Sequence, residues 1–222
     1  MTTIPRGHDR IAPAPAAEHP IGDAMGVLRW EDERAAAAVL ARAFVDDPLV
    51  MAICDAQAAE REERMRWGFR VAIRSHCLTA QPAWMIANDA GQAVGVVLVT
   101  RPRMTVQANI DVLFGLWGLL HIGLRAVSRG AKAARTIAEQ APSGPFTYLR
   151  TLGVAPELHG RGVGSRLVER VIGAAPAGLP IYLETAKERN LGFYARHGFQ
   201  CIGEFRCLEV PVWRLLRPAG LF

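Results

Sequence analysis

A glycine-spaced loop at residues 154–165 is the feature that most constrains how this chain can fold. The loop reads Val-Ala-Pro-Glu-Leu-His-Gly-Arg-Gly-Val-Gly-Ser. A β-rich run at 146–154 leads into it, and a helical pattern at about 164–174 follows it. The apolar side chains of that helix align on one face: Leu167, Val168, Val171, Ile172 and Ala175. A strand that turns through such a loop into an amphipathic helix predicts an α/β fold.

The glycines of this loop predict a phosphate-binding nest. Gly160, Gly162 and Gly164 permit backbone angles that other residues resist, so consecutive N–H groups can point into one concavity. The N-terminus of the following helix adds partial positive charge there. A dinucleotide-binding fingerprint needs G-x-G-x-x-G early in a βαβ unit, and a Walker loop needs Gly-Lys before Ser or Thr. Here the glycines read G-x-G-x-G late in the chain and precede Ser165-Arg166, which excludes both motifs.

The rest of the chain predicts a mixed sheet flanked by helices. The expected elements are a strand at 26–30, a helix after the acidic residues 31–33, a helix at 57–78, hairpin strands at 83–87 and 93–100, helices at 107–125 and 128–140, strands at 146–154 and 181–185 around the helix at 164–174, a short helix at 189–197, and two closing strands within 199–216. We expect a helix break at Ser128-Arg129-Gly130 and an edge-strand position for Pro211.

Length and composition fit one globular domain. The chain has 222 residues, of which 50% are hydrophobic and 21% are charged. Residues 1–22 are expected to be a disordered tail, because they contain charges and Ala/Pro repeats without the apolar core of a signal peptide. Residues 23–222 are then expected to form a single domain with a helical insert at about 103–144.

Charge and cysteine usage argue against several classes of partner. The net charge of +5 comes without a basic block, so no nucleic-acid partner is expected. The apolar run Val112–Leu124 is interrupted by His121 and is shorter than the roughly 20 residues of a membrane span, so no membrane association is expected. The cysteines lack metal-ligand or disulfide spacing, which predicts no metal and a reducing, cytoplasmic location: Cys54, Cys77, Cys201 and Cys207.

The loop resembles the acetyl-CoA loop of the GNAT superfamily of N-acetyltransferases, Gln/Arg-x-x-Gly-x-Gly/Ala after a strand. Gly162 and Gly164 match the pattern, whereas His159 stands at the Gln/Arg position. The segments 182–185 and 189–199 resemble the last strand–helix–strand unit of that family, in wording closest to its puromycin N-acetyltransferase-like members. The resemblance covers about residues 145–207. It implies a mostly antiparallel central sheet with one splayed parallel pair of strands.

The resemblance also implies acetyl-CoA as the acyl donor, with no metal. Its pantetheine arm would lie between the strands at 146–154 and 181–185 and pair with free backbone groups of Leu152 and Val154. Its pyrophosphate would lie in the loop. The implied cofactor-binding residues are Leu152, Gly153, Val154, His159, Gly160, Arg161, Gly162, Val163, Gly164, Ser165 and Asn190.

Direct attack of an amine on the thioester needs proton transfer rather than an enzyme nucleophile. By the resemblance, Tyr194 is the general acid that protonates the departing thiolate, with the packing of its ring on the sheet as the alternative. Glu184 is the candidate general base, or else a structural ion-pair partner. Asn190 either contacts the amide arm of the cofactor or caps a helix.

Four further residues are expected to play structural parts. His159 is expected to be exposed at the loop, and His197 is expected to shape the turn before Gly198. Cys201 and Cys207 are interpreted as core residues rather than nucleophiles.

The acceptor should be chosen by the first two helices and by the insert, where Trp117 and His121 could line an apolar pocket. We expect a small-molecule amine. The alternatives are a CoA-binding sensor without turnover, or a protein N-acetyltransferase. Edge strands near the C-terminus could support a homodimer.

Overall fold

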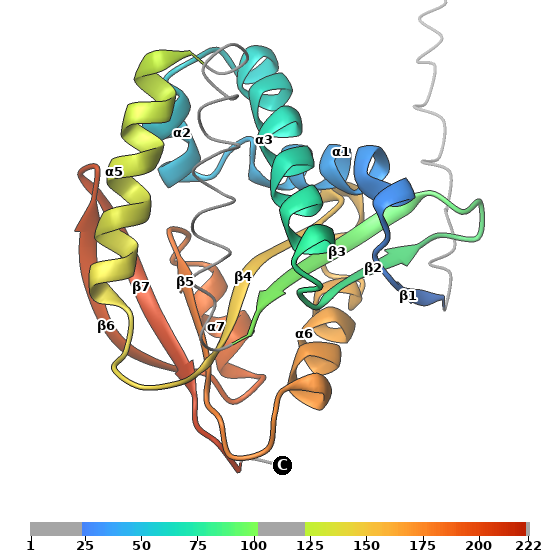
Figure 1. Ribbon diagram of the computed structural model, residues 1–222, viewed down its shortest axis with the longest axis vertical. Helices are drawn as coiled ribbons and strands as arrows, with labels where there is room; N and C mark the ends of the chain where they lie inside the picture. The colour runs from blue at the N-terminus through green and yellow to red at the C-terminus, as the bar shows by residue number, and fades with distance from the viewer. Residues whose placement is uncertain (1–23, 102–122, 221–222) are drawn as a thin grey trace, which may run out of the picture.

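The computed structural model describes residues 24–101 and 123–220 (Figure 1). Its strands form one seven-stranded sheet in the order β1-β2-β3-β4-β5-β7-β6. The sheet is mixed and has helices on both faces, which confirms the predicted α/β class. The expected N-terminal tail and most of the apolar run at 112–124, including Trp117 and His121, lie outside the described residues.

Three antiparallel strands form one side of the sheet. They are β1 (Met25–Val27), β2 (Ala83–Ala87) and β3 (Ala93–Thr100). The hairpin between β2 and β3 is the predicted one. Its turn is closed by the Asn88 side chain, whose Oδ1 accepts hydrogen bonds from the backbone N–H groups of Ala90 and Gln92.

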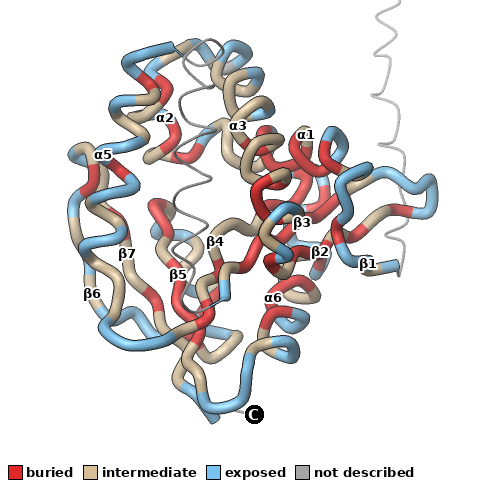
Figure 2. The backbone as a smooth tube through the Cα atoms, in the orientation of Figure 1, coloured by how far each residue is buried: buried red, intermediate tan, exposed pale blue. Residues whose placement is uncertain are grey.

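Alternation along β3 divides the core between the two faces of the sheet. Val96 and Leu98 pack against α1 (Glu33–Phe44) and α3 (Ala58–Leu78), while Val97 and Val99 pack against α6 (Val163–Ala174). Figure 2 shows the buried segments of α1 and α6 turned toward the strands between them. The two longest predicted helices of the N-terminal half are therefore confirmed.

The middle of the sheet opens where two parallel strands diverge. β4 (Thr147–Val154) and β5 (Ile181–Thr185) pair only at Thr147 with Ile181 and at Tyr148 with Tyr182, as far as the structure describes the chain. Beyond Tyr148, β4 continues to pair with β3 on its other side. The edge of β4 that faces β5 is therefore left open toward its C-terminal end.

β6 (Gln200–Cys207) and β7 (Val210–Arg217) close the sheet, with β6 at the edge. The expectation that Pro211 lies on an edge strand is wrong, because β7 is internal. Pairing of β7 with β5 begins only at Trp213, so no strand on that side needs a backbone N–H from position 211, which proline lacks. The core interpretation of Cys207 is confirmed and that of Cys201 is wrong, because a register shift after Cys201 leaves its side chain exposed.

Two helices differ from the prediction. α2 (Pro48–Cys54) was not predicted, and α5 (Leu124–Gln140) runs through the expected break at Ser128-Arg129-Gly130. Packing accounts for the continuity of α5: Ala126 and Ala133 are buried, and Gly130 lies against Ile53 of α2. Tertiary contacts here outweigh the weak helix propensity of serine and glycine.

Candidate active site

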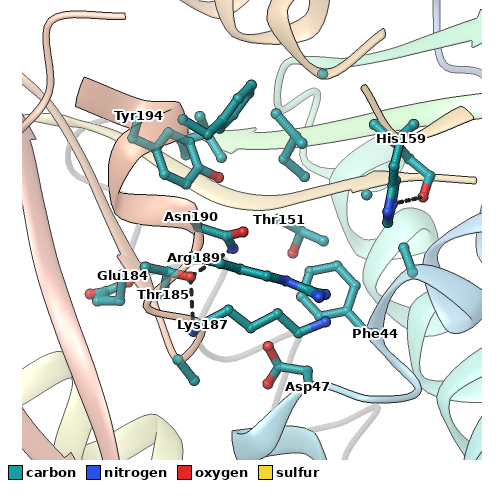
Figure 3. Close-up of a pocket in the computed structure, with 18 of the residues that line it drawn as sticks. Phe44, Asp47, Thr151, His159, Glu184, Thr185, Lys187, Arg189, Asn190 and Tyr194 are labelled. Atoms are coloured by element: carbon teal, nitrogen blue, oxygen red, sulfur yellow. Dashed lines mark hydrogen bonds between the residues drawn. The ribbon is translucent and has the colours of Figure 1, made fainter. Parts of the chain in front are cut away.

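A cavity of about 590 Å³ lies where β4 and β5 diverge (Figure 3). Its walls come from segments far apart in the sequence: α1 and α2, β4 with the following loop, the first turn of α6, and β5 with α7 (Asn190–Ala195). Of the predicted cofactor-binding residues, Arg161 is exposed and outside the lining, while the other ten line the cavity. Tyr194 and Glu184 line it as well.

The glycine loop has the geometry of an anion-binding nest. Gly160 and Gly162 adopt φ of 79° and 81°, in the left-handed region that favours glycine. Gly162 is the N-cap of α6, and no side chain caps that helix. The first N–H groups of this 12-residue helix therefore remain available at the cavity wall, where the helix dipole favours a negative ligand.

Gly164 was expected to adopt a backbone angle that other residues resist, but the structure requires a glycine here for close packing. It lies within α6 at a helical backbone angle, and a Cβ at this position would come 3.3 Å from Cζ of Phe193. The absence of a side chain lets α7 approach the first turn of α6. Gly164 thus sets the distance between the loop and the helix that carries Tyr194.

Gly153 likewise owes its identity to packing. A Cβ there would come 2.7 Å from Cδ2 of Leu40 and 3.1 Å from the Cβ of Ala43, both on α1. The loop itself is tied to the same helix, since Arg42 pairs with Glu157 at 2.6 Å. Helix α1 therefore positions both β4 and the start of the glycine loop.

His159 is exposed, as predicted, and its ring lies over the end of β4. Its Nε2 is 3.2 Å from the carbonyl oxygen of Val154, to which it donates a hydrogen bond. This carbonyl belongs to a residue that was expected to pair with a pantetheine arm. Pairing at that oxygen would require His159 to move.

Asn190 is not the helix cap that one interpretation required. The N-cap of α7 is Arg189, and the Asn190 side chain donates instead to Oγ1 of Thr185, at 3.0 Å. Both groups face the cavity (Figure 3). The amide is thus held at the end of β5, on the wall opposite the glycine loop.

Tyr194 is both packed and directed at the cavity. Its ring contacts Phe193 and Phe199 edge-on, with centroids 5.0 and 5.5 Å away, and the residue is 7% exposed. Its hydroxyl points into the cavity in Figure 3. Burial raises the pKa of Tyr194 well above its ordinary value, so the phenol stays protonated at neutral pH and can act as a proton donor.

The Glu184 carboxylate is hydrogen-bonded to a tyrosine rather than paired with a cation. Its Oε2 accepts a hydrogen bond of 2.7 Å from the Tyr148 hydroxyl. Arg214 lies opposite Glu184 on β7, but the two make no ion pair in the described structure. Burial raises the pKa of Glu184 above its ordinary value, and the Tyr148 hydrogen bond opposes that rise. A carboxyl with a raised pKa suits general-base chemistry near neutral pH.

Charged residues that the sequence reading did not single out also line the cavity. Asp47 is the N-cap of α2, and its Oδ1 accepts from the N–H groups of Leu49 and Val50. Lys187 also lines the cavity, and its ammonium group donates to Oδ1 of Asp46. The Asp-Pro pair at 47–48 is a helix-start signal that could have revealed α2.

The remaining candidates lie at the periphery. His197 bonds through Nε2 to Oγ of Ser165, at 3.1 Å, and its carbonyl accepts from Arg217, which is consistent with a structural part at the turn. Across residues 24–101 and 123–220, no group of three or more His, Cys, Asp or Glu side chains is arranged to hold a metal. None of the helices that the structure describes is long and apolar enough to cross a membrane.

Comparison with known proteins connects this geometry to a family. Residues 126–201 match a family model described as an acetyltransferase (GNAT) domain. A Corynebacterium glutamicum structure, described as histone acetyltransferase HPA2 and related acetyltransferase, aligns with a TM-score of 0.68 and 23% identity over 89% of this chain and 97% of that one.

Two further structures share the fold at lower identity. Mosquito arylalkylamine N-acetyltransferase like 5b aligns with a TM-score of 0.53 and 13% identity, over 88% of this chain and 99% of that one. The GphF GNAT-like decarboxylase in complex with isobutyryl-CoA aligns with a TM-score of 0.54 and 17% identity, over 88% of this chain and 98% of that one. The match over residues 126–201, the mixed sheet with its one parallel pair and the strand–loop–helix junction together show that this chain contains a GNAT acetyltransferase domain and has the fold of that superfamily.

Proposed function

We propose that this protein transfers an acetyl group from acetyl-CoA to the amine of a small molecule. The main support for the proposal is that one cavity is lined both by the N-terminus of α6, which no side chain caps, and by two side chains that can transfer protons, Tyr194 and Glu184. The N-terminus suits a pyrophosphate. The side chains suit the removal and delivery of one proton each.

The acyl donor would lie along the open edge of β4. Its pyrophosphate would rest on the first turn of α6, and its pantetheine arm would extend past Leu152 toward Tyr148. The complex of the GphF decarboxylase contains isobutyryl-CoA, which supports an acyl-CoA as the ligand class for this fold. Other chemistry occurs on the same scaffold, so the assignment of acetyl transfer rests on the side chains.

Glu184 and Tyr194 approach from opposite faces of the sheet. Leu183 shares a core cluster with Tyr194 on the α6 side, and alternation directs Glu184 to the other side. The contact of Arg214, the cross-strand neighbour of Glu184, supports that direction, because its guanidinium donates to the carbonyl of Gln140 at the end of α5. An amine can therefore enter beside Glu184 while the thiolate departs toward Tyr194.

The reaction then needs no enzyme nucleophile. The amine nitrogen bonds to the thioester carbonyl carbon, its proton passes to Glu184, and the carbon–sulfur bond breaks. Tyr194 gives its proton to the departing sulfur. The products are the acetamide and CoA thiol, and proton exchange with solvent restores both side chains.

The acceptor side of the cavity favours a small amine with an apolar body. Its described apolar lining comes from α1, α2, α5 and β7: Ala43, Phe44, Leu49, Val50, Ile53, Ile137 and Val212. Among the described residues, four cationic side chains line the cavity against the two carboxylates of Asp47 and Glu184, which disfavours a strongly cationic acceptor such as a basic peptide: Arg150, Lys187, Arg189 and Arg196. A small, largely apolar amine meets both conditions.

Two assays test the proposal. Acetyl-CoA should raise the melting temperature, because it binds the folded state selectively. Thiol release from acetyl-CoA should then appear with at least one member of a panel of arylalkylamines, aminonucleosides and polyamines. A rise in melting temperature without thiol release from any amine would favour a CoA-binding sensor. An unchanged melting temperature at saturating acetyl-CoA would contradict the binding of acetyl-CoA.

A further inference from the structure

All three tyrosines of the chain lie at or beside this cavity, and Tyr194 is the only one that the proposed reaction uses. Tyr148 and Tyr182 sit at the last paired position of β4 and β5, immediately before the strands diverge. Their rings stack with centroids 6.0 Å apart. Tyr148 lines the cavity at this point, and Tyr182 packs behind it.

The two hydroxyls have different surroundings. The Tyr148 hydroxyl donates to Oε2 of Glu184 at 2.7 Å. The Tyr182 hydroxyl is buried and has no hydrogen-bond partner among the described residues. Glu184 therefore has one oxygen fixed by Tyr148, while its Oε1 is also buried without a partner in the described structure. Because Oε1 is enclosed by protein, Oε2 is the carboxylate oxygen that remains to meet a ligand at the cavity.

We propose that Tyr148 is a positioning residue for the acyl transfer: its hydrogen bond to Oε2 holds the Glu184 carboxyl at the cavity wall, where the amine of the acceptor would approach. The proposal rests on the proposed function, in which Glu184 is the general base. Tyr148 touches neither the acceptor nor the acyl group in this role. It acts by fixing the rotamer and favouring the charged form of Glu184.

The electrostatic surroundings of Glu184 are set by several elements. The charged group that acts on Glu184 is Arg214 on β7, while Arg150 on β4 acts on Tyr148. Lys187, after β5, and Asp47, at the start of α2, line the same cavity. Burial opposes the ionisation of Glu184 most strongly, while the tyrosine hydroxyls and Arg214 favour the carboxylate. Loss of the Tyr148 hydroxyl should therefore raise the pKa of Glu184.

The test compares two substitutions that each remove one hydroxyl from the stacked pair. The Glu184 carboxyl is titrated by ¹³C NMR in glutamate-labelled protein, with its signal assigned by its absence in Glu184→Gln. Tyr148→Phe should raise the Glu184 pKa by about one pH unit or more, because a hydrogen bond to a charged group is lost. The matched control Tyr182→Phe should raise it by clearly less. Equal shifts, or no shift in Tyr148→Phe, would overturn the proposal.

A second measurement applies if Tyr148→Phe does not fold. Tyr182→Phe protein is labelled uniformly with 3-fluorotyrosine, which leaves Tyr148 and Tyr194 as the only labelled phenols. Fluorination makes the phenol a stronger donor, so the Glu184 pKa should fall relative to unlabelled Tyr182→Phe protein. An unchanged pKa would contradict the proposal.

Activity separates this inference from the proposed function. With any amine that supports thiol release, the acid limb of the kcat/KM profile should move to higher pH in Tyr148→Phe, because Glu184 must be ionised to accept a proton. Acetyl-CoA should shift the melting temperature of this variant as in the wild type. Thiol release from no amine would contradict the proposed function, whereas an active enzyme with an unmoved acid limb would contradict only the positioning by Tyr148.

Discussion

Tyr194 and Glu184 line one cavity from opposite faces of the sheet. This relationship gives a direction to the proposed chemistry, with the amine on the α5 side and the leaving sulfur on the α7 side. It also separates the two proton-transfer steps, so that each can be altered without changing the other.

Replacement of Tyr194 by Phe should lower turnover by about 10²-fold, because proton delivery by a positioned acid typically contributes 10²–10⁴-fold. Packing should persist, since the ring contacts with Phe193 and Phe199 do not involve the hydroxyl. The raised pKa of Tyr194 also predicts that wild-type activity does not fall on the alkaline side before the ordinary tyrosine range near pH 10. Steady-state kinetics across pH measure both effects. Unchanged turnover in Tyr194→Phe would contradict the role of Tyr194 as the general acid.

Gly162→Val should abolish the melting shift caused by acetyl-CoA. Valine is strained at φ of 81°, and its side chain would stand at the N-terminus of α6, where the pyrophosphate is expected. Gly178→Val is the matched control, because Gly178 has the same φ of 81°, is open to solvent and lies outside the cavity lining. Both variants should lose similar intrinsic stability. Equal melting shifts with acetyl-CoA in the two variants would contradict a nest at Gly162.

Gly95→Ala should weaken acetyl-CoA binding from a distance. A Cβ at Gly95 on β3 would come 2.6 Å from Cγ1 of Val163 and would push the first turn of α6 away from the sheet. Overpacking of this kind typically costs about 1–3 kcal/mol of stability. Gly26→Ala on β1, where a Cβ meets nothing within 4 Å, should leave affinity unchanged. Calorimetric titration with acetyl-CoA compares the two, and equal affinities would mean that the position of α6 does not limit binding.

Glu33→Gln should destabilise the fold by about 3 kcal/mol, because the loss of one member of a buried ionic group leaves its partners uncompensated. Glu33 is 4% exposed and bonds to Arg70 and Arg74 of α3. Burial alone would raise its pKa, but the two guanidinium groups hold that pKa below its ordinary value. A lowered folded-state pKa stabilises the fold above the unfolded pKa of about 4.3, and this stabilisation is lost as the pH falls through the folded value.

Chemical denaturation at neutral pH and below pH 4 measures this effect, and the difference between Glu33→Gln and wild type should shrink at the lower pH. The control is Glu62→Gln, which removes an i,i+4 pair with the half-exposed Arg66 and should cost no more than about 0.5 kcal/mol. A cost for Glu33→Gln as small as that of Glu62→Gln would show that the ionic group does not hold α1 against α3.

Local sequence signals were enough to predict most of the sheet. The bounds of β2, β3 and β5 match the prediction, because turn residues or proline mark their ends. The glycine loop and α6 followed from spacing alone. Helix α2 has only seven residues, too few for a periodic pattern, so the Asp47-Pro48 pair is its one local signal.

Long-range contacts account for what the sequence could not supply. Tyr148 and Glu184 are 36 positions apart, and they meet only because β4 and β5 pair at Tyr148 and Tyr182. The internal place of Pro211 depends in the same way on strand order, which local patterns do not encode. The packing of α5 on α2 likewise outweighed the break expected at Ser128-Arg129-Gly130.

The most direct test of the account follows acetyl transfer itself. Purified protein is incubated with acetyl-CoA and each member of the amine panel, and products are identified by mass spectrometry alongside CoA thiol release. At least one amine should gain a single acetyl group in step with thiol formation, and both signals should be strongly reduced in Glu184→Gln and Tyr194→Phe. Thiol release without an acetylated amine, or equal product from wild type and both variants, would contradict the proposed acetyl transfer.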